Sequence, residues 1–241
     1  MRIVVVSSYR EMSEWAAQAV ALEISRQPAS VLGLATGETP RQMYRELVRL
    51  HRAAGLCFAA VTAFALDEYI GLSPDNPASF NYYLHDHLFG HLDPPLGNIH
   101  LIDALAADID LECARYERQI AASGGIDLQV LGIGQNGHIG FNEPGTSFAL
   151  GMHRVELTPS TVDSNARHFA EPAQVPRSAI TLGISNILHA KKILLLASGK
   201  SKSEALRLAL HGGVTPHVPA SALQTHPDVT WVADRDAASL L

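Results

Sequence analysis

Three polar side chains, two of them suited to proton transfer, lie within eight positions of one glycine-rich segment. The segment runs from Gly134 to Ser147 and carries Asn136, His138 and Glu143. An imidazole titrates near neutral pH, and a nearby carboxylate can assist the movement of its proton. The spacing therefore favours a proton-transfer pair, while a structural loop with incidental polar groups is the alternative.

A further carboxylate, Asp67, directly follows the apolar run Val61–Leu66. We expect this run to be a buried strand, and a carboxylate at the end of a buried strand is well placed for acid–base chemistry. The alternative is an aspartate that caps a helix or a turn, which is common at such positions.

Two other loops have the composition of anion-binding sites. In Ala35–Pro40, Gly37 allows a tight turn between a predicted strand and a predicted helix, so that backbone N–H groups at the helix start point outward. A plain strand-to-helix turn would have the same composition. The loop Ala197–Lys202 offers a lysine at a helix start, but Leu194 stands where a nucleotide P-loop requires glycine.

Several cofactor and hydrolase sites fit the sequence poorly. Gly132–Gly137 has the spacing of a dinucleotide fingerprint, but the glycines and the proline that follow it exclude the helix which that fingerprint requires. The histidines between positions 85 and 91 lack the cysteine or carboxylate spacing of a zinc site. No Gly-x-Ser-x-Gly elbow is present. We predict no metal and no organic cofactor.

Apolar runs and helical patterns alternate along the chain. The predicted strands are Ile3–Val6, Val31–Ala35, Val61–Leu66, Asp127–Ile133, Val155–Leu157, Ala179–Leu182, Lys192–Ala197 and Val229–Val232. The predicted helices cover Glu11–Ser25, Thr39–Ala54, Ser79–Phe89, Asp108–Ala122 and Lys202–Leu210.

Turn and cap residues divide these elements. Thr39 is expected to cap the second helix, with Pro40 and Gln42 completing its start and Gly55 ending it. Asp67–Pro77 is expected to be a loop.

Strands without polar alternation are buried on both faces, and helices between them imply parallel crossovers. The sequence therefore predicts an α/β fold with helices on both sides of a mostly parallel sheet, in a single domain that spans 1–241. Ligands in such folds bind beyond the carboxyl ends of the strands, which is where the four loops above are expected to lie.

Composition excludes several classes of partner. The chain has 241 residues and a net charge of −6, which does not favour nucleic acid or a membrane surface as a partner. No run approaches the roughly 18 apolar residues of a spanning helix. Cys57 and Cys113 form neither a disulfide framework nor a metal motif. We expect a cytoplasmic protein.

Taken together, the motifs resemble those of the glucosamine-6-phosphate deaminase family. The segments that carry the resemblance are Leu32–Pro40, Leu66–Tyr69, Asn76–Phe80, Leu131–Pro144, Asn165–Arg167, Ser221–Gln224 and His226-Pro227. They span nearly the whole chain in family order. Gly-His-Ile-Gly-Phe-Asn-Glu-Pro, at 137–144, is the most specific, because the related 6-phosphogluconolactonases depart from it after the Gly-His stem.

The resemblance implies a Rossmann-like three-layer fold and the conversion of D-glucosamine 6-phosphate and water to D-fructose 6-phosphate and ammonia. It implies that Asp67 moves a proton between C2 and C1, and that His138 opens the pyranose ring with the help of Asn136 and Glu143. The residues implied to bind the phosphate and the substrate are Thr36, Gly37, Glu38, Thr39, Gly137, Arg167 and Lys202.

Two positions depart from the family pattern. Many relatives carry aspartate where this chain has Asn136, and an amide cannot raise the pKa of His138 as a carboxylate would. We therefore expect Glu143 to supply that electrostatic support. Glu38 stands where relatives have a small residue, so we expect its side chain to point away from the phosphate.

Other functions stay open at this stage. They are a 6-phosphogluconolactonase-like enzyme, a galactosamine-6-phosphate isomerase and a sugar-phosphate sensor without catalysis. A sensor of this kind usually adds a DNA-binding module, for which this chain has no spare residues. Because the predicted elements end close to Leu241, we expect no allosteric segment and a monomer, with a homo-oligomer as the alternative.

Overall fold

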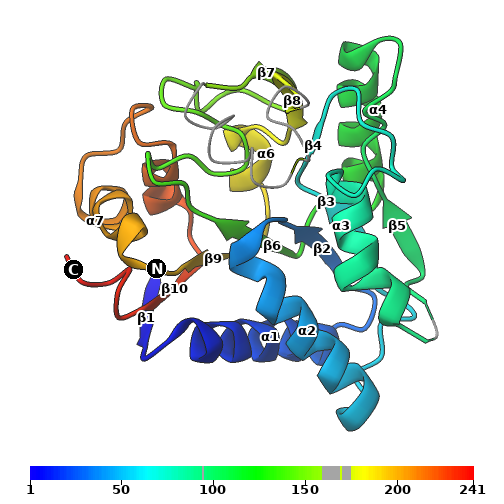
Figure 1. The fold of residues 1–241 in the computed structure, drawn as a ribbon, viewed down its shortest axis with the longest axis horizontal. Coiled ribbons are helices and arrows are strands. Elements are labelled where there is room, and N and C mark those ends of the chain that lie inside the picture. The colour runs from blue at the N-terminus through cyan, green and yellow to red at the C-terminus, as the bar shows by residue number, and fades with distance from the viewer. Residues whose placement is uncertain (94, 159–168, 170–174) are drawn as a thin grey trace.

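Seven parallel strands form the central sheet of the computed structural model, which describes residues 1–93, 95–158, 169 and 175–241 (Figure 1). The strands are β1 (Arg2–Val6), β2 (Val31–Leu34), β3 (Thr62–Ala65), β5 (Asn98–His100), β6 (Leu128–Gly132), β9 (Lys192–Ala197) and β10 (Val229–Asp234). Their order in the sheet is β1-β10-β9-β6-β2-β3-β5, and every neighbouring pair is parallel.

Helices cover both faces of this sheet. They are α1 (Tyr9–Arg26), α2 (Glu38–Ala54), α3 (Phe80–His87), α4 (Ile109–Ala122), α6 (Ile184–Leu188) and α7 (Ser203–His211), with the 3₁₀ helices η1 (Phe89–His91), η4 (Lys200–Lys202) and η5 (Pro219–Thr225). The core residues of α1, α2 and α3 belong to one hydrophobic cluster, and those of α4, α6, α7 and η5 belong to another.

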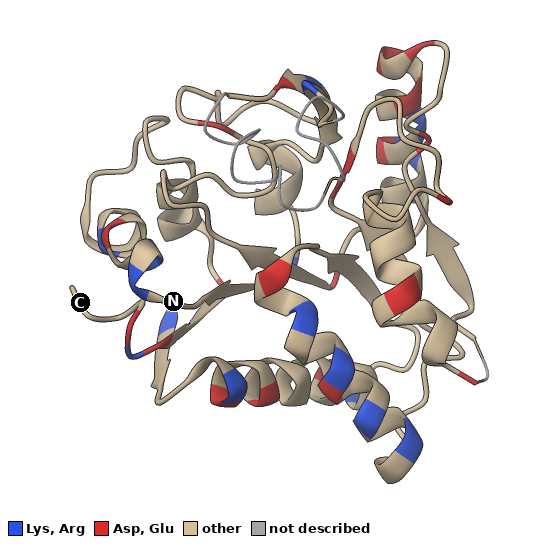
Figure 2. Ribbon diagram, viewed as in Figure 1, with Lys and Arg blue, Asp and Glu red and all other residues tan. Residues whose placement is uncertain are grey.

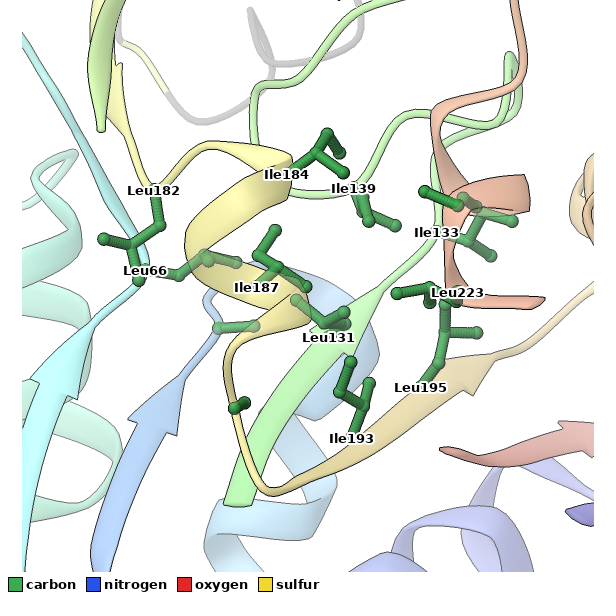
Figure 3. Packing of buried hydrophobic residues seen from close by; sticks show 14 of the residues in the cluster. Leu66, Leu131, Ile133, Ile139, Leu182, Ile184, Ile187, Ile193, Leu195 and Leu223 are labelled. Carbon is green, nitrogen blue, oxygen red and sulfur yellow. The ribbon is translucent and has the colours of Figure 1, made fainter. Parts of the chain in front are cut away.

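Side-chain alternation in β9 shows how one strand serves both clusters. Leu194 and Leu196 pack with the α1–α2–α3 cluster, whereas Ile193, Leu195 and Ala197 pack with the opposite one. Figure 3 shows the second cluster, in which Ile187 of α6 lies above the β6 and β9 side chains. The three-layer α/β fold with a parallel central sheet is confirmed.

Charged residues gather on the helices rather than on the middle of the sheet (Figure 2). The strands β2, β3 and β6 read VLGL, TAFA and LQVLG and contain no charged residue. Such strands suit burial on both faces. Cys57, which is exposed, and Cys113, which is buried, are both unpaired. Among the described residues, none of the helices combines the length and the apolar character needed to cross a membrane.

A second, three-stranded antiparallel sheet was not predicted. It consists of β4 (Asp67–Tyr69), β8 (Ser178–Thr181) and β7 (His153–Glu156), in the order β4-β8-β7. The prediction of a loop over Asp67–Pro77 is therefore wrong for its first three residues. A three-residue strand has no readable periodicity, and its partner β8 lies more than a hundred positions away in sequence.

Leu66 joins the two sheets. Its N–H donates to the Leu34 carbonyl of β2 at 2.9 Å, and its carbonyl accepts from the Leu182 N–H at 2.9 Å. The chain thus leaves the central sheet after β3 and enters the smaller sheet at Asp67, so the two sheets meet where the candidate base stands.

The start of α2 differs from the expected one. The helix begins at Glu38 with Gly37 as its N-cap, and no side chain caps it, so the predicted Thr39 cap and its box with Gln42 are wrong. Gly37 takes a φ of 89°, which L side chains rarely adopt, and this turn moves the N-cap from the predicted Thr39 to Gly37. The end at Gly55 is confirmed, with a left-handed φ of 71°.

We predict that Leu131→Ala lowers the free energy of unfolding by about 2–5 kcal/mol, because it leaves a cavity between β6 and the helices above it. Leu131 is completely buried and packs in the cluster of Figure 3. Urea unfolding at neutral pH measures the change. Leu111→Ala is the matched control, since Leu111 is 65% exposed, and an equal loss in both variants would contradict the assignment of the core.

Candidate active site

The predicted site residues follow strands that are neighbours in the sheet. β9, β6, β2 and β3 lie side by side and are parallel, so their carboxyl ends share one edge. From β2 the sheet continues to β3 and β5 on one side and to β6, β9 and β10 on the other (Figure 1). The gap between β2 and β6 is therefore a topological switch point, where open α/β sheets bind their ligands.

The segment after β6 forms tight turns, and the helix required by a dinucleotide fingerprint is absent over residues 133–145. Glycines let its side chains pack against the main chain. A Cβ at Gly134 would lie 2.3 Å from the His138 ring, so the imidazole rests directly on that glycine.

His138, Glu143 and Asn136 form one network. The His138 Nδ1 atom lies 3.9 Å from Glu143 Oε2. The Asn136 amide donates to Glu143 Oε2 at 2.8 Å, and its oxygen accepts from the His138 backbone N–H at 3.2 Å. Asn136 therefore orients the carboxylate and the main chain of the loop, and Glu143 is the anion beside the ring.

Thr158 adds a contact that sequence reasoning missed. Its hydroxyl donates to Glu143 Oε1 at 3.3 Å, so hydrogen bonds reach both oxygens of this buried carboxylate. Nothing near Thr158 in the sequence marks it, since its partner lies fifteen positions earlier.

The electrostatic surroundings keep the imidazole neutral. Burial lowers the pKa of His138 below its usual value of 6.5; the charge of Glu143 opposes this, and the charge of Lys202 adds to it. A neutral imidazole at neutral pH can accept a proton. The effect of Lys202 also places this lysine of η4 near the ring.

Asp67 is enclosed and has an unusually high pKa. Its side chain is 5% exposed, and Oδ1 has no hydrogen-bond partner among the described residues. Burial, with a smaller effect from the charge of Glu68, raises the pKa of Asp67 from 3.8 to about 8. A carboxylate of this kind gives up its proton reluctantly and is a correspondingly strong base when ionised.

Asp67 and His138 meet around the same stretch of chain. A Cβ at Gly140, two residues after His138, would lie 3.5 Å from Asp67 Oδ2 and 2.8 Å from Thr181 Oγ1. The side chain of Asp67 therefore reaches the loop that carries the imidazole.

Glu68 belongs to the motif Leu66–Tyr69, but its structural role was not predicted. Its buried carboxylate accepts hydrogen bonds from the Ser79 hydroxyl and from the backbone N–H groups of Tyr69, Phe80 and Asn81. It thus fixes the start of α3 against β4. An acidic residue inside an apolar stretch was the available indication, because buried carboxylates need such partners.

The loop after β2 lies beside the loop after β6. Thr36, Gly37 and Thr39 are half-buried, and a Cβ at Gly132 would lie 3.9 Å from Thr39 Cβ. Glu38 is exposed, and its carboxylate pairs with Arg41 at 3.4 Å. The first-turn N–H groups of α2 stand at this edge with the positive end of the helix dipole.

Two other predicted positions lie close to the imidazole. Gly137, with a φ of 85°, packs against Val218, where an added Cβ would lie 2.8 Å from Val218 Cγ1. The Gly199 N–H donates to Asp234 at 3.1 Å, which holds the turn before Lys202. Arg167 lies outside the described residues. Within the part of the chain that the structure describes, no group of His, Cys, Asp and Glu side chains could hold a metal ion.

Comparison with known proteins shows the family of this chain. The family model described as glucosamine-6-phosphate isomerases/6-phosphogluconolactonase matches residues 7–231. The chain belongs to this family. A glucosamine-6-phosphate deaminase of Geobacillus sp. (strain WCH70) is 50% identical over 241 residues, covering 100% of this chain and 96% of that protein. One from Thermoanaerobacter pseudethanolicus is 47% identical, with coverage of 100% and 95%.

Solved structures divide the family into near and distant relatives. A monomeric glucosamine-6-phosphate deaminase is 46% identical and superposes with a TM-score of 0.96 over 100% of both chains. The 6-phosphogluconolactonase of Trypanosoma brucei is 20% identical, with a TM-score of 0.80 over 100% of this chain and 98% of that one. The likeness to the 6-phosphogluconolactonase shows a shared fold alone, whereas the likeness to the monomeric deaminase extends to the sequence.

We predict that Asp67→Asn stabilises the protein more at high pH than at low pH. Because the pKa of Asp67 is raised from 3.8 to about 8, only the folded state holds its proton between those values. The stability that Asp67 contributes is thus present below about pH 4 and is lost as the pH rises through about 8. Asparagine cannot ionise, so it avoids this loss.

Thermal unfolding of both proteins from about pH 5 to about pH 8.5 measures the effect as a growing difference in melting temperature. Asp75→Asn is the control, since Asp75 is exposed in the loop after β4. A constant difference for Asp67→Asn across this range would contradict the raised pKa.

Proposed function

We propose that this protein converts D-glucosamine 6-phosphate and water into D-fructose 6-phosphate and ammonia. The observation that carries the proposal is the approach of the buried Asp67 carboxylate to Gly140, in the loop that carries the His138–Glu143 pair beside the switch point of the sheet. The full-length identity of 47–50% to glucosamine-6-phosphate deaminases favours this reaction over others of the family.

Ring opening is the first step and falls to His138. The neutral imidazole takes the proton of the anomeric hydroxyl and returns a proton to the ring oxygen. Its transient positive charge is compensated by Glu143, which lies 3.9 Å from the ring nitrogen. Asn136 serves this step indirectly by holding the Glu143 carboxylate at 2.8 Å.

Proton transfer between carbons is the second step and falls to Asp67. The ionised carboxylate removes the C2 proton to give an enolamine and then delivers a proton to C1. The resulting imine at C2 adds water and releases ammonia. A protonated substrate amine would lower the pKa of Asp67 on binding, because a cation nearby favours the ionised carboxylate.

The phosphate is a remote handle that fixes the sugar for both steps. We assign it to the backbone amides of Thr36–Thr39, with charge from Lys202 and Arg167, and we place Gly137 against the substrate. The ion pair between Glu38 and Arg41 supports a role for Glu38 through its N–H rather than its carboxylate.

The cellular location and the oligomeric state complete the proposal. We place the protein in the cytoplasm, in keeping with its unpaired cysteines. We propose a monomer, as described for the 46% identical deaminase. Galactosamine 6-phosphate is the competing substrate within the same chemistry.

We predict that the wild type forms ammonia and fructose 6-phosphate in equal amounts from glucosamine 6-phosphate, and that Asp67→Asn lowers kcat by roughly 10²–10⁴-fold. A coupled fructose-6-phosphate assay with parallel ammonia detection measures both. Galactosamine 6-phosphate and 6-phosphogluconolactone are the comparison substrates. Faster turnover of either one, or unchanged kcat in Asp67→Asn, would overturn the assignment.

We predict that Glu143→Gln lowers kcat by roughly tenfold to a hundredfold with little change in KM, because ring opening loses the anion that balances imidazolium. It should also lower the pKa of His138 further, since the charge of Glu143 raises it. The pKa is read from the imidazole NMR signals. Glu156→Gln is the exposed control, and unchanged turnover in Glu143→Gln would refute the role.

A further inference from the structure

Three tyrosine hydroxyls hold the main chain of the loop between β2 and α2. They donate to three of the four consecutive carbonyl groups of residues 35–38, which are the loop and the first residue of α2: Tyr44 to Ala35 at 2.5 Å, Tyr83 to Gly37 at 2.6 Å and Tyr9 to Glu38 at 2.7 Å. We call Tyr9, Tyr44 and Tyr83 the tyrosine brace. None of the motifs that suggested the reaction points to them.

The brace comes from three separate helices, because Tyr9 lies on α1, Tyr44 on α2 and Tyr83 on α3. Tyr44 is fully buried, and its ring meets that of Tyr83 edge to face at 6.2 Å. A buried tyrosine needs a partner for its hydroxyl. Packing alone, however, does not require three hydroxyls from three helices to converge on one short loop.

Because each peptide unit is planar, the direction of a carbonyl group also sets the direction of the N–H group that follows it. In a trans peptide the C=O and the following N–H point in opposite directions. Fixing the carbonyls of residues 35, 37 and 38 therefore fixes the N–H groups of Thr36, Glu38 and Thr39 on the other side of the loop.

The two sides of the loop face different layers of the molecule. The tyrosines pack with the α1–α2–α3 cluster, so the held carbonyls point toward that layer. The opposite cluster contains Ile133 and Ile139, which flank the His138 loop. The N–H groups of Thr36, Glu38 and Thr39 thus point toward the imidazole side, and among the described residues none of them has an acceptor.

Tyr9 has a second contact that strengthens the first turn of α2. Its hydroxyl oxygen accepts from the Gln42 N–H at 3.2 Å while the hydroxyl donates to the Glu38 carbonyl. It therefore bridges the two groups that are paired in an ordinary first turn, in a helix that has no side-chain cap.

We propose that Tyr9, Tyr44 and Tyr83 are positioning residues for the substrate, which preset the N–H groups of residues 36, 38 and 39 for the oxygens of the sugar phosphate. The inference rests on the proposed function for the identity of the anion. None of the three side chains touches the reacting carbons, so their effect falls on binding of the phosphate. Because the hydroxyls already hold the loop in its binding conformation, little conformational entropy is lost when the phosphate binds. Without the tyrosine brace, the loop would lose that entropy on each binding event.

The test uses Tyr9→Phe, Tyr44→Phe and Tyr83→Phe, which keep the ring and remove only the hydroxyl. Each change should raise the dissociation constant of inorganic phosphate, and the KM for glucosamine 6-phosphate, by roughly twofold to tenfold, as expected for one neutral hydrogen bond. Titration calorimetry with inorganic phosphate and initial-rate kinetics measure the two quantities. kcat should change less than KM.

Two controls separate positioning from stability. Tyr116→Phe removes a buried hydroxyl that donates to the Ala65 and His100 carbonyls at 3.0 and 2.9 Å, at the ends of β3 and β5, and to no carbonyl of residues 35–38. It should lower the melting temperature and leave the phosphate affinity unchanged. Tyr82→Phe changes the exposed neighbour of Tyr83 and should leave both unchanged. A merely structural role of the brace would give all three variants the behaviour of Tyr116→Phe.

The outcomes for the brace and for the function are distinct. A wild type that deaminates the substrate, with brace variants of unaltered phosphate affinity and KM, overturns the brace alone. A wild type that binds phosphate without deaminating, with weakened variants, supports the brace and refutes the proposed reaction. A wild type that fails to bind inorganic phosphate and sugar phosphates overturns the inference.

Discussion

The burial of a parallel sheet on both faces is the constraint on which the rest of this structure depends. Its middle strands, β2, β3 and β6, are uncharged and lie between two hydrophobic clusters, so polar chemistry can stand only beyond the strand ends. At the carboxyl edge the segments that follow β9, β6, β2 and β3 begin side by side. Between β2 and β6 the order of the strands reverses, because β3 and β5 are added on one side of β2 and β6, β9 and β10 on the other. The acid, the imidazole and the anion loop meet for that reason.

Burial also sets the electrostatic character of the site. The adjacent carboxylates Asp67 and Glu68 share a buried strand, yet Glu68 accepts hydrogen bonds from the start of α3 while Oδ1 of Asp67 accepts none from the described residues. Burial raises the pKa of both carboxyl groups, but the hydrogen bonds that Glu68 accepts oppose the rise, whereas the pKa of Asp67 reaches about 8. Two carboxyl groups on one strand thus acquire different chemistry from their burial and their hydrogen-bond partners.

The sequence predicted what depends on local pattern. The bounds of β9 agree with Lys192–Ala197, because five consecutive buried apolar positions follow Lys192. Glu143 was expected to support His138, and it is the anion beside the ring. Features set by distant partners were missed: β4 is defined by pairing with β8, and Tyr9 reaches a carbonyl twenty-nine positions away. No pattern within a short window encodes such contacts.

Leu66 gives the site a fixed length. Its main chain is hydrogen-bonded to Leu34 of β2 on one side and to Leu182 on the other, so Asp67 stands in a fixed backbone register with the end of β2, where the loop that we propose for the phosphate starts. The span between carboxylate and anion loop is therefore built from peptide units rather than from adjustable rotamers. In the proposed reaction this fixed span would select substrates by length, because a sugar with one carbon more or fewer between the phosphate and C2 would place a different atom beside Asp67.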